Sequence, residues 1–306
     1  MKWSRSGDTV LRVSKAGKVN MPWIVAVFII LLAGAGFPAE ATTSEKISVY
    51  VSILPQKFFV ERIGAGKVSV SVMVRPGASP ETYEPTPRQM AALEKTHLYF
   101  RIAVPFESVW IDQIRAINAN LKIIACCGSL QVSEHTGHDH EGRDRDSHIW
   151  TSPRNAIIIA GVIRDALSEF DPENRMVYQQ NHEVLVRELT RLDVTLQEML
   201  ASMPHRYLVV SHPSWGHFAD AYNLEQIPLE QNGSEIRARQ LANIIEMARR
   251  ENIRTVFSQK QFNSGSAEVL AREIDGRVVQ LDPLAENYLD NLYQTGEKIR
   301  EGAFNK

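Results

Sequence analysis

From residue 47 onward, short runs rich in β-branched and aromatic residues alternate with helical stretches. The first part of the chain predicts strands over 47–53, 68–74, 98–102 and 121–125, separated by helices over 55–63, 87–93 and 106–117. The last third predicts strands over 207–210, 255–257 and 277–281, with helices over 237–250 and 266–274 between them. Such alternation places parallel strands in a sheet that is covered by helices. Because 306 residues exceed what one core usually holds, we expect an α/β protein with two lobes and mainly parallel sheets.

A long helical stretch separates these two parts. The pairs Ser152-Pro153 and Asp171-Pro172 each offer an N-cap and a first-turn proline for a helix. The second helix meets no further glycine or proline until Pro204, and at 1.5 Å per residue it would extend for roughly 45 Å. We therefore expect an N-terminal lobe at 46–150, a helical connection with one long backbone helix at 151–203, and a C-terminal lobe at 204–306.

Four residues that can bind a metal follow extended runs. They are Glu81, His148, His212 and Asp282. In an open α/β sheet, ligands bind beyond the carboxyl ends of the strands, so side chains at such ends can converge. Two imidazoles and two carboxylates complete a first coordination shell for a divalent transition metal. Taken singly, each has a plainer interpretation: His212 as a packed turn residue, for example, or Asp282 as a turn former before Pro283.

Two neighbours of these positions are alternative ligands. Glu84 could take the role of Glu81, although a carboxylate there also suits the N-terminus of the next helix. His217 could act beside His212, although packing is the simpler role for it.

The N-terminus has the features of an export signal. Lysines and arginines precede an apolar run over 23–35, and Ala39-Glu40-Ala41 supplies the small residues that signal peptidase accepts. The apolar run is shorter than the roughly 20 residues that span a bilayer. We therefore expect residues 1–41 to be a cleaved signal peptide and the mature protein to be periplasmic. The net charge of −2 gives no reason to expect a nucleic-acid partner.

Two further features have no assigned role. Cys126 and Cys127 are the two cysteines of the chain, and a bond between adjacent cysteines is strained, so we expect no disulfide framework. A polar loop at 134–147 carries His135, His138 and His140. Short histidine-rich tracts can capture metal weakly, but a polar loop with no ligand is the alternative.

Four segments together carry a resemblance to a known family. They are PGASPETYEPTP at 76–87, SHIWTSP at 147–153, SHPSWG at 211–216 and LDPL at 281–284. They resemble the metal-site motifs of the solute-binding proteins of zinc and manganese ABC importers, and the similarity spans about residues 46–303. The resemblance implies two lobes joined by one long helix, with a metal buried between them and passed to a membrane permease.

The same resemblance implies which residues bind the metal. His148, His212 and Asp282 match the family's ligand positions, whereas position 81 carries glutamate where the family usually has histidine. The implied site is therefore mixed, with two histidines and two carboxylates. Imidazoles suit zinc, while oxygen ligands shift the preference toward manganese or iron. With the histidine-bearing loop beside it, the resemblance favours Zn²⁺ as the transported ligand over Mn²⁺ or Fe²⁺.

The expected function is capture of a divalent metal by a monomeric carrier for an ABC importer permease, rather than catalysis. A secreted metallohydrolase is the alternative from another class, but the sequence contains neither a His-Glu-x-x-His helix nor a Gly-x-Ser-x-Gly elbow. A metal-dependent adhesin is a further alternative, since relatives are sometimes described in that way.

Overall fold

The computed structural model describes residues 45–127, 130, 146–231, 234–262 and 265–304, and residues 45–306 form one compact unit. The expected signal peptide at 1–41 and His135, His138 and His140 lie outside the described residues. Within the described part, no helix is long and apolar enough to cross a membrane.

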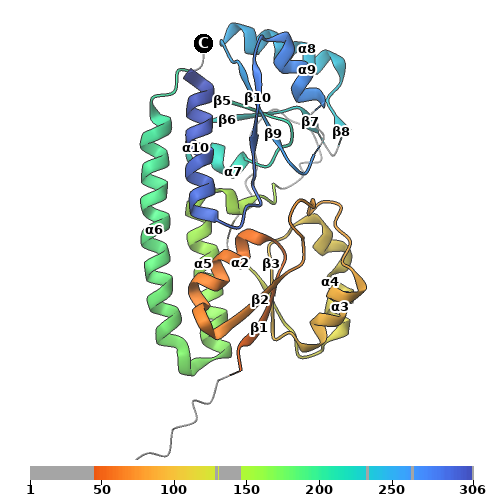
Figure 1. The fold of residues 1–306 in the computed structure, drawn as a ribbon, viewed down its shortest axis with the longest axis vertical. Helices are drawn as coiled ribbons and strands as arrows, with labels where there is room; N and C mark the ends of the chain where they lie inside the picture. Colours follow the sequence, from red (N-terminus) through yellow and green to blue (C-terminus); the bar gives the residue numbers. More distant parts are fainter. Residues whose placement is uncertain (1–44, 128–129, 131–145, 232–233, 263–264, 305–306) are drawn as a thin grey trace, which may run out of the picture. The chain divides into compact units, whose positions relative to one another are not determined.

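The first lobe is built on a four-stranded parallel sheet of order β2-β1-β3-β4 (Figure 1). Its elements are β1 (Ile47–Val51), α2 (Leu54–Gly64), the 3₁₀ turn η1 (Ala65–Lys67), β2 (Val68–Val72), α3 (Pro87–Ala92), η2 (Leu93–Lys95), β3 (Leu98–Arg101), α4 (Pro105–Ile117) and β4 (Lys122–Ala125). Strands β1 and β3 are almost wholly buried, as expected for central strands with helices on both faces.

The second lobe repeats this plan with a sheet of order β10-β9-β5-β6, which is also parallel. Its elements are β5 (Tyr207–Val210), α7 (Gly216–Ala221), β6 (Glu225–Pro228), β7 (Glu230–Gln231), β8 (Ser234–Glu235), α8 (Ala238–Arg250), β9 (Thr255–Gln259), α9 (Gly265–Glu273), β10 (Arg277–Leu281) and α10 (Tyr288–Phe304). The α/β fold with two parallel-sheet lobes is thus confirmed.

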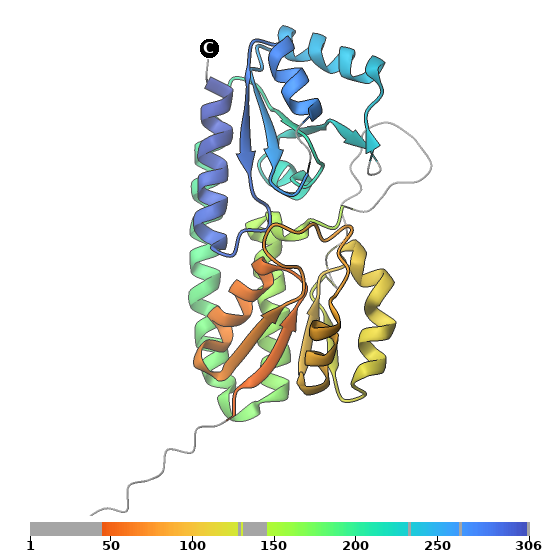
Figure 2. The ribbon, with the colours of Figure 1, turned by 45° about the vertical axis from the view of Figure 1, so that its right-hand side comes forward.

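The connection between the sheets is helical. It contains η3 (Ile149–Thr151), α5 (Pro153–Phe170), η4 (Pro172–Asn174) and α6 (Arg175–Ala201). Helix α6 has 27 residues and so extends for about 40 Å. It packs against α2 and α5 beside the first sheet and against α10 beside the second, as Figures 1 and 2 show. The expected long backbone helix is therefore present.

The leucines of α6 lie in a hydrophobic core that includes residues of both sheets. Leu185, Leu189 and Leu196 have no exposed surface. A smaller cluster fills the space between β9 and the helices α8 and α9. Since one core continues from lobe to lobe along α6, the ends of the two sheets are held at fixed positions.

The extended run that we expected to end at His148 does not end as a strand. Residues 146–148 are irregular backbone leading into η3, so His148 does not end a strand. The Asp146 carboxylate accepts a hydrogen bond from the backbone N–H of His148 at 2.9 Å, and the carbonyl of His148 accepts one from the Thr151 hydroxyl at 2.9 Å. Local bonds of this kind replace the ladder bonds of a strand.

Candidate metal centre

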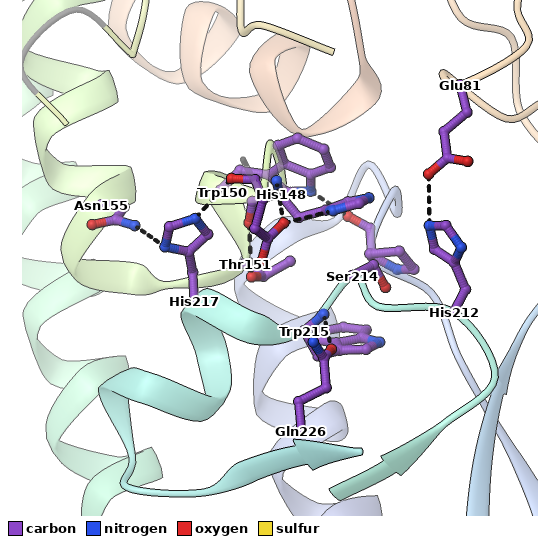
Figure 3. Close-up of polar contacts among 12 residues, drawn as sticks. Glu81, His148, Trp150, Thr151, Asn155, His212, Ser214, Trp215, His217 and Gln226 are labelled. Carbon is purple, nitrogen blue, oxygen red and sulfur yellow. Dashed lines mark hydrogen bonds and ion pairs between the residues drawn. The ribbon is translucent and has the colours of Figure 1, made fainter. Parts of the chain in front are cut away.

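Three of the four predicted ligands lie together. One ligand atom from each of Glu81, His148 and His212 can be chosen so that all three lie within 4.8 Å of one another. Glu81 comes from the β2–α3 loop of the first lobe, His212 from the β5–α7 loop of the second, and His148 from the segment before η3. In Figure 3, the carboxylate of Glu81 points toward the imidazole of His212. The group therefore draws its members from both lobes and from the connection.

The loop that carries Glu81 is held by contacts on both sides of that residue. The carbonyl of Pro80 accepts a hydrogen bond from the backbone N–H of Phe106 at 3.2 Å. Tyr83 is buried, packs edge-on against the ring of Phe106, and donates from its hydroxyl to Gln89 at 2.9 Å. Glu81 is thus supported by a fixed loop, while its own side chain remains 25% exposed.

His212 lies two residues beyond the end of β5, as a ligand at a parallel strand end should. Its Nε2 atom lies 2.7 Å from Glu81 Oε1, and its Nδ1 atom lies 3.0 Å from Glu230 Oε2. The ring of Phe262 stacks on the imidazole, with a centroid separation of 3.9 Å and an interplanar angle of 14°. Both edges and one face of this ring are therefore in contact.

His148 is held by a carboxylate in the same way. Its Nδ1 atom lies 2.8 Å from Asp146 Oδ1, and its ring packs against Trp150. The indole N–H of Trp150 donates to the carbonyl of Pro283 at 2.7 Å, and the hydroxyl of Tyr288 donates to the carbonyl of Trp150 at 2.6 Å. The first bond joins the His148 segment to the loop that contains Asp282, and the second joins it to the start of α10.

Asp282 follows β10 directly but is not a member of the group of three. Its Oδ1 atom accepts hydrogen bonds from the backbone N–H of Leu284 at 2.9 Å and from the amide of Gln261 at 3.2 Å. It lines a cavity of about 510 Å³ between the start of α10 and the loop after β2. The structure thus brings Asp282 to the same end of the sheet without turning it into the cluster.

The charges of the cluster are coupled. Burial lowers the pKa of His212, but the carboxylates of Glu81 and Glu230 outweigh it and leave that pKa above 6.5. Burial raises the pKa of Glu81, but the hydrogen bond and charge of His212 and the charge of His148 outweigh it and leave that pKa below 4.5. In the metal-free protein between pH 4.5 and pH 6.5, Glu81 and His212 therefore form an imidazolium–carboxylate pair, with a proton where a cation could bind.

Two carboxylates beside the histidines were not predicted from the sequence. Asp146 is one of two aspartates in the stretch RDRD at 143–146, and Glu230 follows an edge strand that the pattern did not indicate. The spacing of Asp146, two residues before a candidate ligand, is the one signal that could have been used. Of the two alternative ligands, Glu84 is exposed, and His217 is buried with its Nε2 atom 3.1 Å from the carbonyl oxygen of Asp146.

The two cysteines are free, as expected. Cys126 is buried just beyond β4 and Cys127 is partly buried. Burial raises the pKa of both thiols, so neither resembles a reactive thiolate.

The donor set restricts the chemistry. Two imidazole nitrogens and a carboxylate oxygen suit zinc and other divalent first-row metals, and such a set is too nitrogen-rich for calcium or magnesium. The side chains of His148 and His212 are only 11% and 4% exposed. A metal held here would therefore be largely withdrawn from water.

Comparison with known structures defines the class. A crystal structure of ZnuA is 39% identical and superposes with a TM-score of 0.80 over 85% of this chain and 100% of that chain. A ZnuA deletion mutant with zinc bound is 38% identical, with a TM-score of 0.81 over 86% of this chain and 100% of that chain. The fold is that of a two-lobed metal-binding solute-binding protein.

Sequence comparison gives the family. Residues 49–302 match the model of the family described as zinc-uptake complex component A, periplasmic. A protein of Chlamydia trachomatis described as metal-binding is 28% identical over 257 residues, which cover 81% of this chain and 89% of that protein. The zinc-binding protein AdcA of Streptococcus pyogenes is 24% identical over 78% of this chain, which spans half of that longer protein. This chain belongs to the zinc-uptake complex component A family, which confirms the resemblance seen in the sequence.

Proposed function

We propose that this protein is a periplasmic carrier that captures one divalent transition metal, with zinc preferred, and delivers it to the permease of an ABC importer. The observation that carries the proposal is the group of Glu81, His148 and His212, whose ligand atoms come within 4.8 Å of one another from both lobes and the connection. Family membership and the zinc-bound state of a 38% identical relative support it.

Asp282 is the fourth ligand in this proposal. It directly follows β10, and the next residue, Pro283, accepts a hydrogen bond from Trp150 of the His148 segment. Among the described residues, both hydrogen bonds to this carboxylate go to Oδ1, so the proposal gives Oδ2 to the metal. A closed set of four ligands suits a carrier, because a catalytic metal needs an open coordination position for substrate.

Zinc is preferred because two of the proposed ligands are imidazoles and because the affinity order places zinc above manganese and iron for a given site. The two carboxylates, Glu81 and Asp282, are the ligands that favour the alternatives, manganese and iron. The cleaved signal peptide at 1–41 and a monomeric state in the periplasm complete the proposal.

Equilibrium zinc binding on the purified mature protein tests the proposal. We expect one tight zinc per chain, loss of that site in His148→Ala and in His212→Ala, and no change in His182→Ala. His182 lies half-buried on α6 and serves as a matched control. Unchanged stoichiometry and affinity in both cluster variants would overturn the proposed site.

Delivery needs a cellular test. In cells that lack their own carrier but retain the permease, the wild-type protein should restore growth on limiting zinc, and His212→Ala should not. Restoration by the variant that no longer binds zinc would contradict the carrier role.

A further inference from the structure

Two carboxylates outside the proposed ligand set contact its two histidines at the same ring atom. Asp146 Oδ1 lies 2.8 Å from Nδ1 of His148, and Glu230 Oε2 lies 3.0 Å from Nδ1 of His212. Both carboxylates are largely buried, with 15% and 17% of their side-chain surface exposed. The same local arrangement therefore occurs twice, on segments that are far apart in the sequence.

The chemistry of these contacts determines which nitrogen can bind a metal. An ionised carboxylate only accepts hydrogen bonds, so each Nδ1 atom must carry the hydrogen of its contact. A neutral imidazole with hydrogen on Nδ1 has its free lone pair on Nε2. For His212, Nε2 is also the atom that faces Glu81, at 2.7 Å.

We propose that Asp146 and Glu230 are positioning residues, which hold hydrogen on Nδ1 of His148 and His212 and so present both Nε2 atoms to the metal. This inference rests on the proposed function. The loss of carboxylates in this place typically weakens metal affinity by about 10–100-fold.

The contacts of the two carboxylates are directed at the histidines rather than at the surrounding fold. Among the described residues, the side-chain hydrogen bonds of Asp146 go to the ring and backbone N–H of His148, and that of Glu230 goes to the ring of His212. Among those residues, neither carboxylate pairs with a lysine or arginine, so the imidazole is the ring each one contacts.

Both carboxylates are themselves fixed by backbone contacts. The imidazole of His217, on α7, lies with Nε2 3.1 Å from the carbonyl oxygen of Asp146. The backbone of Glu230 lies opposite that of Glu235 in the antiparallel β7–β8 hairpin. The neighbouring Leu229 donates its N–H to the carbonyl of Val210 at 2.8 Å. The backbone that carries each carboxylate is therefore fixed beside the histidine that the carboxylate contacts.

Zinc affinity in two graded series of variants tests the inference. Asp146→Asn and Glu230→Gln keep an acceptor but lose the charge, whereas Asp146→Ala and Glu230→Ala lose both. Glu235→Gln and Glu235→Ala are the matched controls, because Glu235 is exposed and lies opposite Glu230 in the same hairpin. Measured by competition with a chelator, zinc affinity should fall about 10–100-fold in the alanine variants, less in the amide variants, and not at all in the controls.

Ring nitrogen chemical shifts of the zinc-loaded wild-type protein report directly which nitrogen of each histidine carries hydrogen and which binds zinc. A purely structural role for the carboxylates makes no prediction about these shifts. Long-range ¹H–¹⁵N spectra should show protonated Nδ1 and zinc-bound Nε2 for both His148 and His212. Zinc bound through Nδ1 at either histidine would overturn the assignment of its carboxylate. This measurement needs no variant, so zinc bound through Nδ1 would overturn the proposal even where an alanine variant fails to fold.

The failures of the two proposals are distinguishable. If the wild-type protein binds no zinc, the proposed function fails and this inference with it. If the wild-type protein binds zinc and the alanine variants keep affinities within about twofold of it, only the positioning role is overturned.

Discussion

Residue 81 is the position at which the proposed metal site departs from the resemblance, because it carries glutamate where histidine is expected. Its carboxylate oxygen lies 2.7 Å from the imidazole of His212, which places an oxygen where the resemblance leads one to expect nitrogen. Nitrogen ligands favour zinc, and oxygen ligands favour manganese. Under the proposed function, residue 81 is therefore the position at which a substitution should change the metal preference most directly.

Glu81→His should increase the preference for zinc over manganese. Replacing an oxygen donor by an imidazole at nearly the same reach adds a third nitrogen ligand, and we expect the ratio of zinc to manganese affinity to rise at least tenfold, about 1.4 kcal/mol. Competition between the two metals on the wild type and the variant measures that ratio. Equal ratios in the two proteins would show that Glu81 does not contact the metal.

The Glu81–His212 pair should also make the stability of the metal-free protein depend on pH. The raised pKa of His212 stabilises the fold fully below its ordinary value of 6.5, and that contribution is lost as pH rises through the raised value. The lowered pKa of Glu81 stabilises the fold above 4.5, and that contribution is lost as pH falls through the lowered value. The pair therefore stabilises most between about pH 4.5 and pH 6.5.

Glu81→Gln should lower the unfolding temperature of the metal-free protein most within that window and least above neutral pH. Thermal unfolding in the presence of a chelator, over a pH series, measures the difference. An effect of Glu81→Gln on the unfolding temperature that grows above pH 8 would contradict the proposed pairing.

The same pair affects zinc binding. Zinc must displace a proton from His212, so zinc affinity should fall as the pH falls toward 6 and below.

At the scale of elements, the segment η3 fastens the His148 side of the site to the second lobe. Trp150 donates to Pro283, and Tyr288 at the start of α10 donates to Trp150. Tyr288 is 2% exposed, so neither partner of its hydroxyl bond can turn to water instead. These bonds fix the distance between the His148 segment and the loop of Asp282.

Tyr288→Phe should therefore destabilise the protein by about 1–2 kcal/mol, because it leaves the buried carbonyl of Trp150 without its donor. Tyr293→Phe is the control on the same helix, since Tyr293 is 41% exposed, and it should change the free energy of unfolding by less than about 0.5 kcal/mol. Urea unfolding of the two variants provides the comparison. Equal effects would mean that the Tyr288 hydroxyl has no special role.

The strands and helices of the two lobes could largely be predicted, because buried parallel strands and amphipathic helices leave strong periodic signals. Strand β6 was missed because the edge-strand sequence Glu-Gln-Ile-Pro alternates weakly and ends in proline. Helix α10 was not predicted either, although its residues Tyr288, Leu292 and Ile299 are buried. His148 was placed at a strand end because its turn depends on the side chain of Asp146, which a periodic pattern does not contain.

The candidate site was predictable in part for a physical reason. His212 follows β5 almost directly, so the position of that strand end places it, whereas Glu81 lies well beyond the end of β2 and reaches the cluster through the path of its loop. Asp146 and Glu230 depend on the paths of loops, and several other acidic residues in those loops were equal candidates. The sequence therefore indicated which residues could bind a metal better than which residues hold them in place.

At the scale of the whole molecule, α6 restricts how a metal can enter and leave. This helix contacts elements beside both sheets through one continuous core, so a large rotation of one lobe against the other would break that core. Loops absorb such changes more readily than packed helices do. We therefore expect metal exchange to involve the loop around Glu81 rather than a hinge in α6.

Hydrogen exchange with and without zinc tests this expectation. Zinc should slow exchange in peptides that cover residues 74–86 and 211–216 and leave the centre of α6 unchanged. A zinc-dependent change across the middle of α6 would indicate motion of whole lobes.

In the proposed site, four residues bind one metal: Glu81 and His212, from two different lobes, together with His148 and Asp282. Anomalous diffraction at the zinc edge from crystals of the zinc-loaded protein tests it most directly. The account predicts one strong peak, about 2.0–2.2 Å from Nε2 of His148, Nε2 of His212 and carboxylate oxygens of Glu81 and Asp282. A zinc peak elsewhere, or one bound by residues of a single lobe, would contradict it.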